Sequence, residues 1–445
     1  MNKPTLIKNA TIVSSDYLKI ADVLIEDRII TVIEKNISHP SATIIDGTDK
    51  YLFPGIIDCQ VHFREPGFTH KADIYTESKA AVAGGVTSFI DMPNTKPNAL
   101  NTGLLEEKYQ IASEKSLANF GFLLGVNAEN IDEIIHTDTT SMLGVTDDGL
   151  YFTKKGNLLA DNPEIMEKLF AGCTALIAIH SEREEIIEKN ENLYREKYGE
   201  DIPVEFHPLI RSERACYEAS KRAIDLANKH KARLHILHLS TESETHLFRN
   251  DIPLQEKNIT AEVSVHHLWF SDNDYQRLGT LMKWNPAIKK EEDKRGLLNA
   301  LLDDRIDIIT TDHAPHTLKE KRRPYFQSMS GGPMVQHSLN IMLELYRQGK
   351  ISLQKIAEKM CQNPAILYRI KSRGFIREGY FADLVLVDLD TSYTVSSNNI
   401  FYKCRWSPLE GTTFHSSIDK TFVNGNMVYD NGQFNETHKG MRLAK

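Results

Sequence analysis

Short apolar runs alternate with helical patterns through the middle of the chain, from about residue 54 to 375. Eight such runs lie at 55–62, 88–92, 119–126, 142–145, 175–180, 233–239, 260–265 and 306–312. Segments with helical periodicity separate them, among them 103–115, 163–171, 211–230, 291–303 and 335–347. Eight β/α alternations predict an α/β fold of the (β/α)8 TIM-like barrel type, with a doubly wound parallel sheet as the alternative.

The two ends of the chain have a different pattern. Residues 5–13 and 22–34 alternate apolar with polar side chains, and so do residues 382–388 and 421–429. This period of two is typical of antiparallel strands with one exposed face. We therefore predict a small composite β-sandwich domain from residues 1–53 plus 376–445, and a catalytic barrel over residues 54–375.

Composition narrows the class of protein. The net charge of -8 argues against a nucleic-acid partner. No apolar run reaches the roughly 20 residues that are needed to span a bilayer. The five cysteines are scattered and form no C-x-x-C motif, as expected of free thiols in a reducing compartment. These features predict a soluble cytoplasmic protein.

Polar residues follow the apolar runs at the point where each predicted strand ends. In chain order they are Gln60, His62, Arg64, Asn94, Asp148, His180, His238 and Asp312. In a barrel these positions converge on the C-terminal rim, where such enzymes keep their active sites. Imidazole and carboxylate groups without thiolate suit a catalytic Zn²⁺ ion. Asp312 is placed to carry a proton between water and a leaving nitrogen, and Arg64 suits an anionic substrate.

The same residues belong to longer motifs that resemble the amidohydrolase superfamily, most closely the class I dihydroorotases. The motifs are Asp58-x-Gln60-x-His62-x-Arg64, 91–95, 147–149, 238–241, 261–268 and 311–316. Segments 22–27, 379–387 and 423–425 are similar to that family's composite β domain, so the resemblance spans nearly the whole chain.

The resemblance implies a zinc-dependent cyclic amide hydrolase of pyrimidine biosynthesis that interconverts dihydroorotate and N-carbamoyl-L-aspartate. It assigns metal binding to His62, Asp148, His180, His238 and Asp312. It assigns substrate binding to Arg64, Asn94, Asn285 and His316. His266, His267 and His313 lie in matching motifs without an assigned role. A homodimer is expected by analogy alone.

Two positions depart from the pattern that the resemblance implies. Gln60 stands where the family usually has the first histidine of a His-x-His pair, and an amide oxygen is a poorer zinc ligand than imidazole. The sequence therefore leaves open whether each chain binds one zinc ion or two. Many relatives bridge their metals with a carboxylated lysine, so Lys154 or Lys155 competes with Asp148 for that role.

Two other functions remain open at this point. An allantoinase or hydantoinase would use the same chemistry on another ring, since the loop 330–337 differs from that of the resembling family. A catalytically silent homologue would serve as a structural partner, for example of aspartate transcarbamoylase, and Gln60 is the feature in its favour.

Overall fold

The computed structural model describes residues 3–138, 142–150, 159 and 162–445. Its centre is a ring of parallel strands. The ring consists of β6 (Ile56–Val61), β7 (Val86–Asp91), β8 (Asn119–Phe122), β9 (Leu124–Gly125), β10 (Val145–Thr146), β11 (Ile177–Ile179), β12 (Leu234–Ile236), β13 (Ile259–Ser264) and β14 (Ile308–Thr310). One residue separates β8 from β9, so these two strands fill one position of the eight.

The pairing of the strands closes this ring into a barrel. Strand β6 pairs in parallel with β7, and β7 pairs with β8. A second series of parallel pairs runs from β9 to β14. A parallel bridge between Val61 and His313 then joins the last strand to the first. The (β/α)8 barrel predicted from the sequence is thereby confirmed, and the doubly wound sheet is excluded because that sheet stays open.

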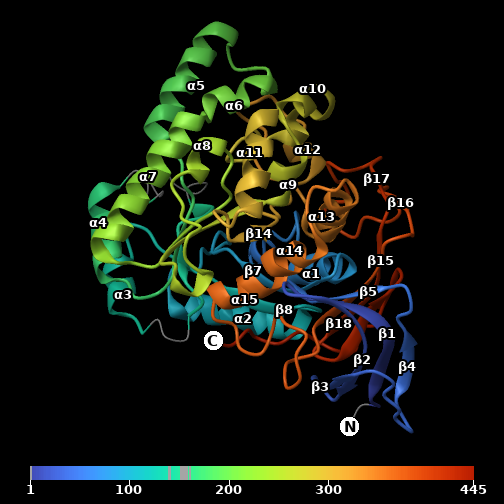
Figure 1. The fold of residues 1–445 in the computed structure, drawn as a ribbon. Helices are drawn as coiled ribbons and strands as arrows, with labels where there is room; N and C mark the ends of the chain where they lie inside the picture. The colour runs from blue at the N-terminus through green and yellow to red at the C-terminus, as the bar shows by residue number, and fades with distance from the viewer. Residues whose placement is uncertain (1–2, 139–141, 151–158, 160–161) are drawn as a thin grey trace.

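Helices cover the outside of the barrel (Figure 1). They are α1 (Ile74–Ala83), α2 (Thr102–Lys115), α3 (Ile131–His136), α4 (Pro163–Gly172), α5 (Glu184–Tyr198), α6 (His207–Ile210), α7 (Glu213–His230), α8 (Glu242–Thr245), α9 (Val265–Trp269), α10 (Tyr275–Leu278), α11 (Glu291–Leu302), α12 (Leu318–Lys321), α13 (Ser338–Arg347), α14 (Leu353–Ala357) and α15 (Asn363–Leu367).

Helix α7 shows why these segments are helical. Ser212 caps its first turn by accepting a hydrogen bond from the Ala215 backbone N–H. Ala215, Ala219, Ala223 and Ala227 recur every four residues and are all buried, so they form one apolar stripe against the barrel. Among the described residues, no helix is long and apolar enough to cross a bilayer.

Both ends of the chain contribute to a second sheet of nine strands. It contains β1 (Thr5–Val13), β2 (Leu18–Glu26), β3 (Ile29–Glu34), β4 (Thr43–Asp46), β5 (Tyr51–Pro54), β15 (Leu384–Asp388), β18 (Ser417–Val423), β19 (Asn426–Asp430) and β20 (Gln433–Phe434). Antiparallel pairing of β5 with β15 joins the two ends, and in Figure 1 the blue and red strands lie side by side.

The sheet is held by a core of its own, which includes Ile12, Leu52, Leu384 and Phe422. A separate short pair, β16 (Tyr393–Thr394) and β17 (Thr413–Phe414), lies outside it. The barrel therefore carries an extra sheet domain made from both termini. The boundaries at residues 53/54 and 375/376 stay a prediction.

Candidate active site

The polar residues expected at the strand ends meet at one end of the barrel. Gln60 is the last residue but one of β6, and the others follow the ends of their strands. All the expected metal-binding side chains are buried: Gln60, His62, Asp148, His180, His238 and Asp312. All of them except Gln60 form two groups of possible metal ligands that share Asp148. Lys154 and Lys155, the competing bridging residues, lie outside the described residues.

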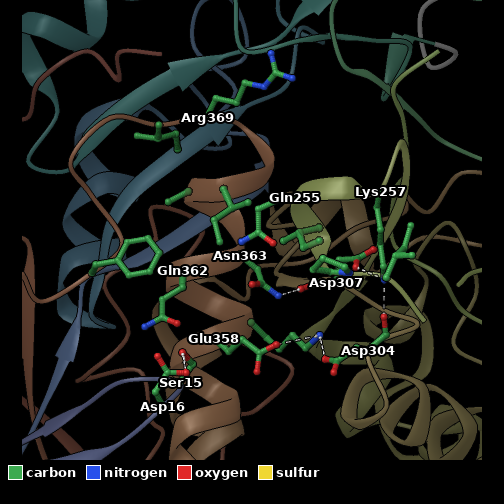
Figure 2. A pocket seen from close by; sticks show the side chains of 18 of the residues that line it. Ser15, Asp16, Gln255, Lys257, Asp304, Asp307, Glu358, Gln362, Asn363 and Arg369 are labelled. Atoms are coloured by element: carbon green, nitrogen blue, oxygen red, sulfur yellow. Dashed lines mark hydrogen bonds and ion pairs between the residues drawn. The ribbon is translucent and has the colours of Figure 1, made fainter. Parts of the chain in front are cut away.

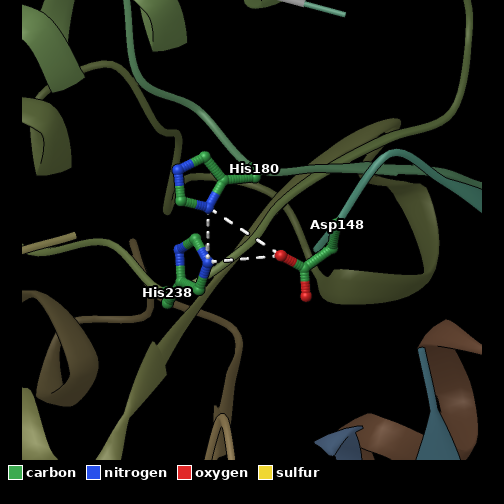
Figure 3. Close-up of side chains that lie close together, drawn as sticks. All are labelled: Asp148, His180 and His238. Atoms are coloured by element: carbon green, nitrogen blue, oxygen red, sulfur yellow. Dashed lines mark hydrogen bonds and ion pairs between the residues drawn. The ribbon is translucent and has the colours of Figure 1, made fainter. Parts of the chain in front are cut away.

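The first group consists of Asp148, His180 and His238, whose ligand atoms lie within 4.8 Å of one another. His180 Nδ1 is 3.1 Å from His238 Nε2. Asp148 Oδ1 is 3.8 Å from His180 Nδ1 and 4.0 Å from His238 Nε2. Figure 3 shows the three side chains pointing toward one common point. Two imidazoles and a carboxylate in this arrangement fit a divalent ion such as zinc.

The second group consists of His62, Asp148 and Asp312. His62 Nε2 lies 3.1 Å from Asp312 Oδ1 and 3.3 Å from Asp148 Oδ2. Asp148 thus turns one oxygen toward each group. A carboxylate in that position can bridge two cations, so the donor set fits two metal ions as well as one.

The electrostatics of the second group favour a cation. Burial alone would lower the pKa of His62, but the carboxylates of Asp148 and Asp312 outweigh it and raise that pKa to about 10. Burial raises the pKa of Asp312 to about 6, against the opposing effect of His62. Two carboxylates around one imidazole therefore leave an excess of negative charge that a metal ion would balance.

Hydrogen bonds to the outer ring nitrogens orient two of the histidines. Asn94 Oδ1 lies 2.8 Å from His62 Nδ1, and Glu182 Oε2 lies 2.8 Å from His180 Nε2. Because each oxygen accepts a hydrogen bond from the outer ring nitrogen, the opposite ring nitrogen faces the centre and would bind a metal ion once it has lost its proton. Sequence reasoning did not identify Glu182, although its place two residues after His180 was a usable signal.

Glu182 also receives a hydrogen bond from Arg211, so its carboxylate is held from two sides. We expect Glu182→Gln to lower the affinity for metal about 10- to 100-fold, because the neutral amide no longer fixes the His180 ring. Metal affinity is measured by competition with a chromogenic chelator. Glu185→Gln is the matched control, since the Glu185 side chain is 84% exposed. Equal affinities of the two variants would contradict this role.

Gln60 forms part of the site but has an unusual environment. Its side chain is 0% exposed, and its Nε2 donates a hydrogen bond to Asp148 Oδ2 at 3.1 Å. Its Oε1 has no hydrogen-bond partner among the described residues. The amide therefore contacts the oxygen of Asp148 that faces His62, and its own oxygen is a buried acceptor.

Several site residues have strained backbones. Arg64, His238 and Asp312 adopt positive φ angles of 66°, 35° and 44°. Such angles are costly for residues other than glycine and persist where the surroundings enforce them, often at active sites. Gly149 has a φ of 72°, and a Cβ there would lie 2.2 Å from Asn94 Nδ2. Close packing after Asp148 thus requires a glycine.

A small pocket opens beside the second group. His62, Asp148 and Asp312 form one wall, and the expected substrate-binding residues Arg64, Asn94 and Asn285 also line it. Ala314, Ser330 and Gly331 complete it. Sequence analysis had noted the 330–337 loop only as a departure from the family pattern.

Arg64 is the cation of this pocket and is only 6% exposed. Its Nε donates to Pro315 O at 3.2 Å, and its Nη2 lies 3.2 Å from His316 Nε2. It forms no ion pair with a carboxylate in the part of the chain that the structure describes. His316 contacts Arg64 and Lys71 and is not among the residues that line the pocket.

A larger cavity of about 950 Å³ lies at the other end of the barrel. Figure 2 shows it lined by side chains such as Lys257, Asp304 and Asp307, from the segments that lead into β13 and β14. Lys257 Nζ pairs with Asp307 Oδ1 at 2.7 Å. The cavity contains none of the expected site residues and lies away from the carboxyl ends of the strands, where barrel enzymes act.

Comparison with known proteins agrees with this geometry. Residues 51–428 match the Amidohydrolase family. A dihydroorotase from Methanosarcina acetivorans is 32% identical over 91% of this chain and 88% of its own length. An allantoinase from Desulfitobacterium hafniense is 30% identical over 96% of both. The solved structure of an L-hydantoinase (dihydropyrimidinase) from Arthrobacter aurescens covers 100% of both chains, with a TM-score of 0.91 and 24% identity.

The family match spans most of the chain and includes every residue of the two ligand groups. The solved structure supports the barrel with its extra sheet domain. The buried histidines and carboxylates stand where this fold performs its chemistry. The chain therefore belongs to the amidohydrolase family.

Proposed function

We propose that this cyclic amidohydrolase is a zinc-dependent dihydroorotase that interconverts dihydroorotate and N-carbamoyl-L-aspartate in pyrimidine biosynthesis. The observation that carries the proposal is the buried guanidinium of Arg64. A buried cation that has no carboxylate partner among the described residues favours a substrate that brings one, because burying an unpaired charge is costly. Dihydroorotate carries a carboxylate, whereas allantoin, simple hydantoins and dihydropyrimidines are neutral rings.

The residues of the pocket have distinct roles in this proposal. Arg64 holds the substrate carboxylate with its planar donors, and Asn94 and Asn285 contribute neutral contacts. His316 lies outside the pocket lining and contacts Arg64. Two ligand groups would hold the metal: Asp148 with His180 and His238, and Asp148 with His62 and Asp312. Gln60 would be a weak ligand of the second. When bound, a zinc ion would polarise the ring amide and acidify water.

Asp312 moves the proton in the proposed reaction. Its carboxylate accepts a proton from the attacking water as the new C–O bond forms at the amide carbonyl. The C–N bond of the ring then breaks, and the same proton passes to the leaving nitrogen. Asn94 keeps the His62 ring in place during this exchange through its 2.8 Å hydrogen bond.

The test is hydrolysis of a panel of rings by protein whose metal content has been measured. We expect turnover of dihydroorotate, with a kcat/KM far above those for allantoin, hydantoin and dihydrouracil. Preference for a neutral ring would replace this proposal with an allantoinase or hydantoinase. Absence of both metal and turnover would favour a silent partner protein.

Gln60 leads to a separate prediction about metal binding. Gln60→His should raise the affinity for a second zinc ion about tenfold or more, because imidazole is the better ligand for Zn²⁺. Zinc per chain is measured during titration with a chelator. Gln110→His, at an exposed position of α2, is the control for adventitious binding. If the wild-type protein and Gln60→His bound a second zinc ion with equal affinity, Gln60 would not limit the affinity of the site for zinc.

A further inference from the structure

Two lysines beside the pocket are almost completely buried. Lys321 is 0% exposed and Lys283 is 8% exposed. Neither forms an ion pair with a carboxylate among the residues that the structure describes. Because buried lysines are rare unless their ammonium groups are satisfied, the partners of these two are informative.

The Lys321 ammonium binds backbone carbonyls from two segments. Nζ donates to Lys283 O at 3.0 Å, to Met329 O at 2.8 Å and to Gly331 O at 2.8 Å. An ammonium has three donors, so all of them are used. The side chain therefore ties segment 329–331 to residue 283.

Lys283 strengthens the same connection from the other side. Its Nζ donates to Tyr325 O at 2.7 Å and to Ser328 O at 2.8 Å. Its own carbonyl accepts a hydrogen bond from Gly331 N at 2.9 Å. We call Lys283 and Lys321 the two-lysine clamp, because together they join segment 283–285 to segment 325–331.

The clamped segments carry one side of the pocket. Asn285 lies two residues after Lys283. Lys321 binds the carbonyl of Gly331 itself, and Ser330 lies between this carbonyl and that of Met329, which Lys321 also binds. The fit between the segments is close, since a Cβ at Gly332 would lie 2.5 Å from the Trp284 ring. Neither lysine lines the pocket, but a change in the clamp would move residues that do.

We propose that Lys321, together with Lys283, is a positioning residue that holds Asn285, Ser330 and Gly331 at the spacing that the substrate ring requires. The inference deepens the proposed function and relies on it for the identity of the substrate. The contacts of the clamp itself do not depend on that identity.

The test compares Lys321→Met with the wild-type protein. We expect KM for dihydroorotate to rise about tenfold or more and kcat per bound metal to change less than about threefold, because the ligand groups are untouched. Tryptic cleavage after the exposed Arg322 should become about tenfold faster as the loop opens. Lys319→Met, at an exposed position of the same helix α12, is the control.

The two measurements separate this inference from the proposed function. A folded Lys321→Met protein with unchanged KM would overturn the positioning role, and one with unchanged cleavage would overturn the clamp. If wild type does not hydrolyse dihydroorotate, the proposed function fails and the cleavage rate still decides the clamp. If Lys321→Met does not fold, the same measurements on Lys283→Met, which loses two hydrogen bonds instead of three, decide it.

Discussion

Replacing Asp312 with asparagine is expected to lower kcat about a thousandfold or more while the fold is retained. The carboxyl is buried, its pKa is raised to about 6, and it lies 3.1 Å from His62. Asparagine has nearly the same shape but cannot accept and return a proton, which removes general acid–base catalysis. Steady-state hydrolysis of dihydroorotate gives kcat, and circular dichroism with thermal melting verifies the fold.

Asp312 also belongs to a ligand group, so metal content must be measured on the same samples. We expect the variant to keep a metal at Asp148, His180 and His238, because that group does not include residue 312. Asp303→Asn, at an exposed position, is the control. A variant that binds metal and turns over at a near-normal rate would remove Asp312 from the proton-transfer role.

The sequence was sufficient to predict the barrel and to place polar residues at the ends of its strands. Strand β11 is entirely buried and lies within the continuous apolar run 175–179, which is a local signal. The polar residues at the strand ends follow from the same signal, because parallel strands present their carboxyl ends on one side. His62, Asp148 and Asp312 come together for that reason.

The contacts that distinguish this chain could not be predicted in the same way. Gln60 meets Asp148 across 88 residues of sequence, and their hydrogen bond depends on side-chain rotamers. Asp147 and Asp148 are alike as sequence, yet Asp147 accepts the His180 N–H at 3.1 Å and only Asp148 faces both ligand groups. Lys321 would be taken as an exposed helix residue, since most lysines are.

Arg64→Met is the second change with a large expected effect. Methionine preserves much of the side-chain volume but removes the charge and the donors that would bind the substrate carboxylate. Breaking a buried ion pair costs about 3–5 kcal/mol, which corresponds to a rise in KM of roughly two to four orders of magnitude. Initial rates over a range of dihydroorotate concentrations measure this change.

Dihydrouracil, the same ring without the carboxylate, distinguishes lost recognition from a damaged pocket. In the wild-type protein Arg64 should favour dihydroorotate, because a neutral ring leaves the guanidinium buried without a counter-charge. In Arg64→Met that preference should largely disappear, while the weak activity on dihydrouracil changes little. If both substrates lost the same factor, Arg64 would have to support the pocket wall through its side-chain contacts with Pro315 and His316 instead of recognising the substrate.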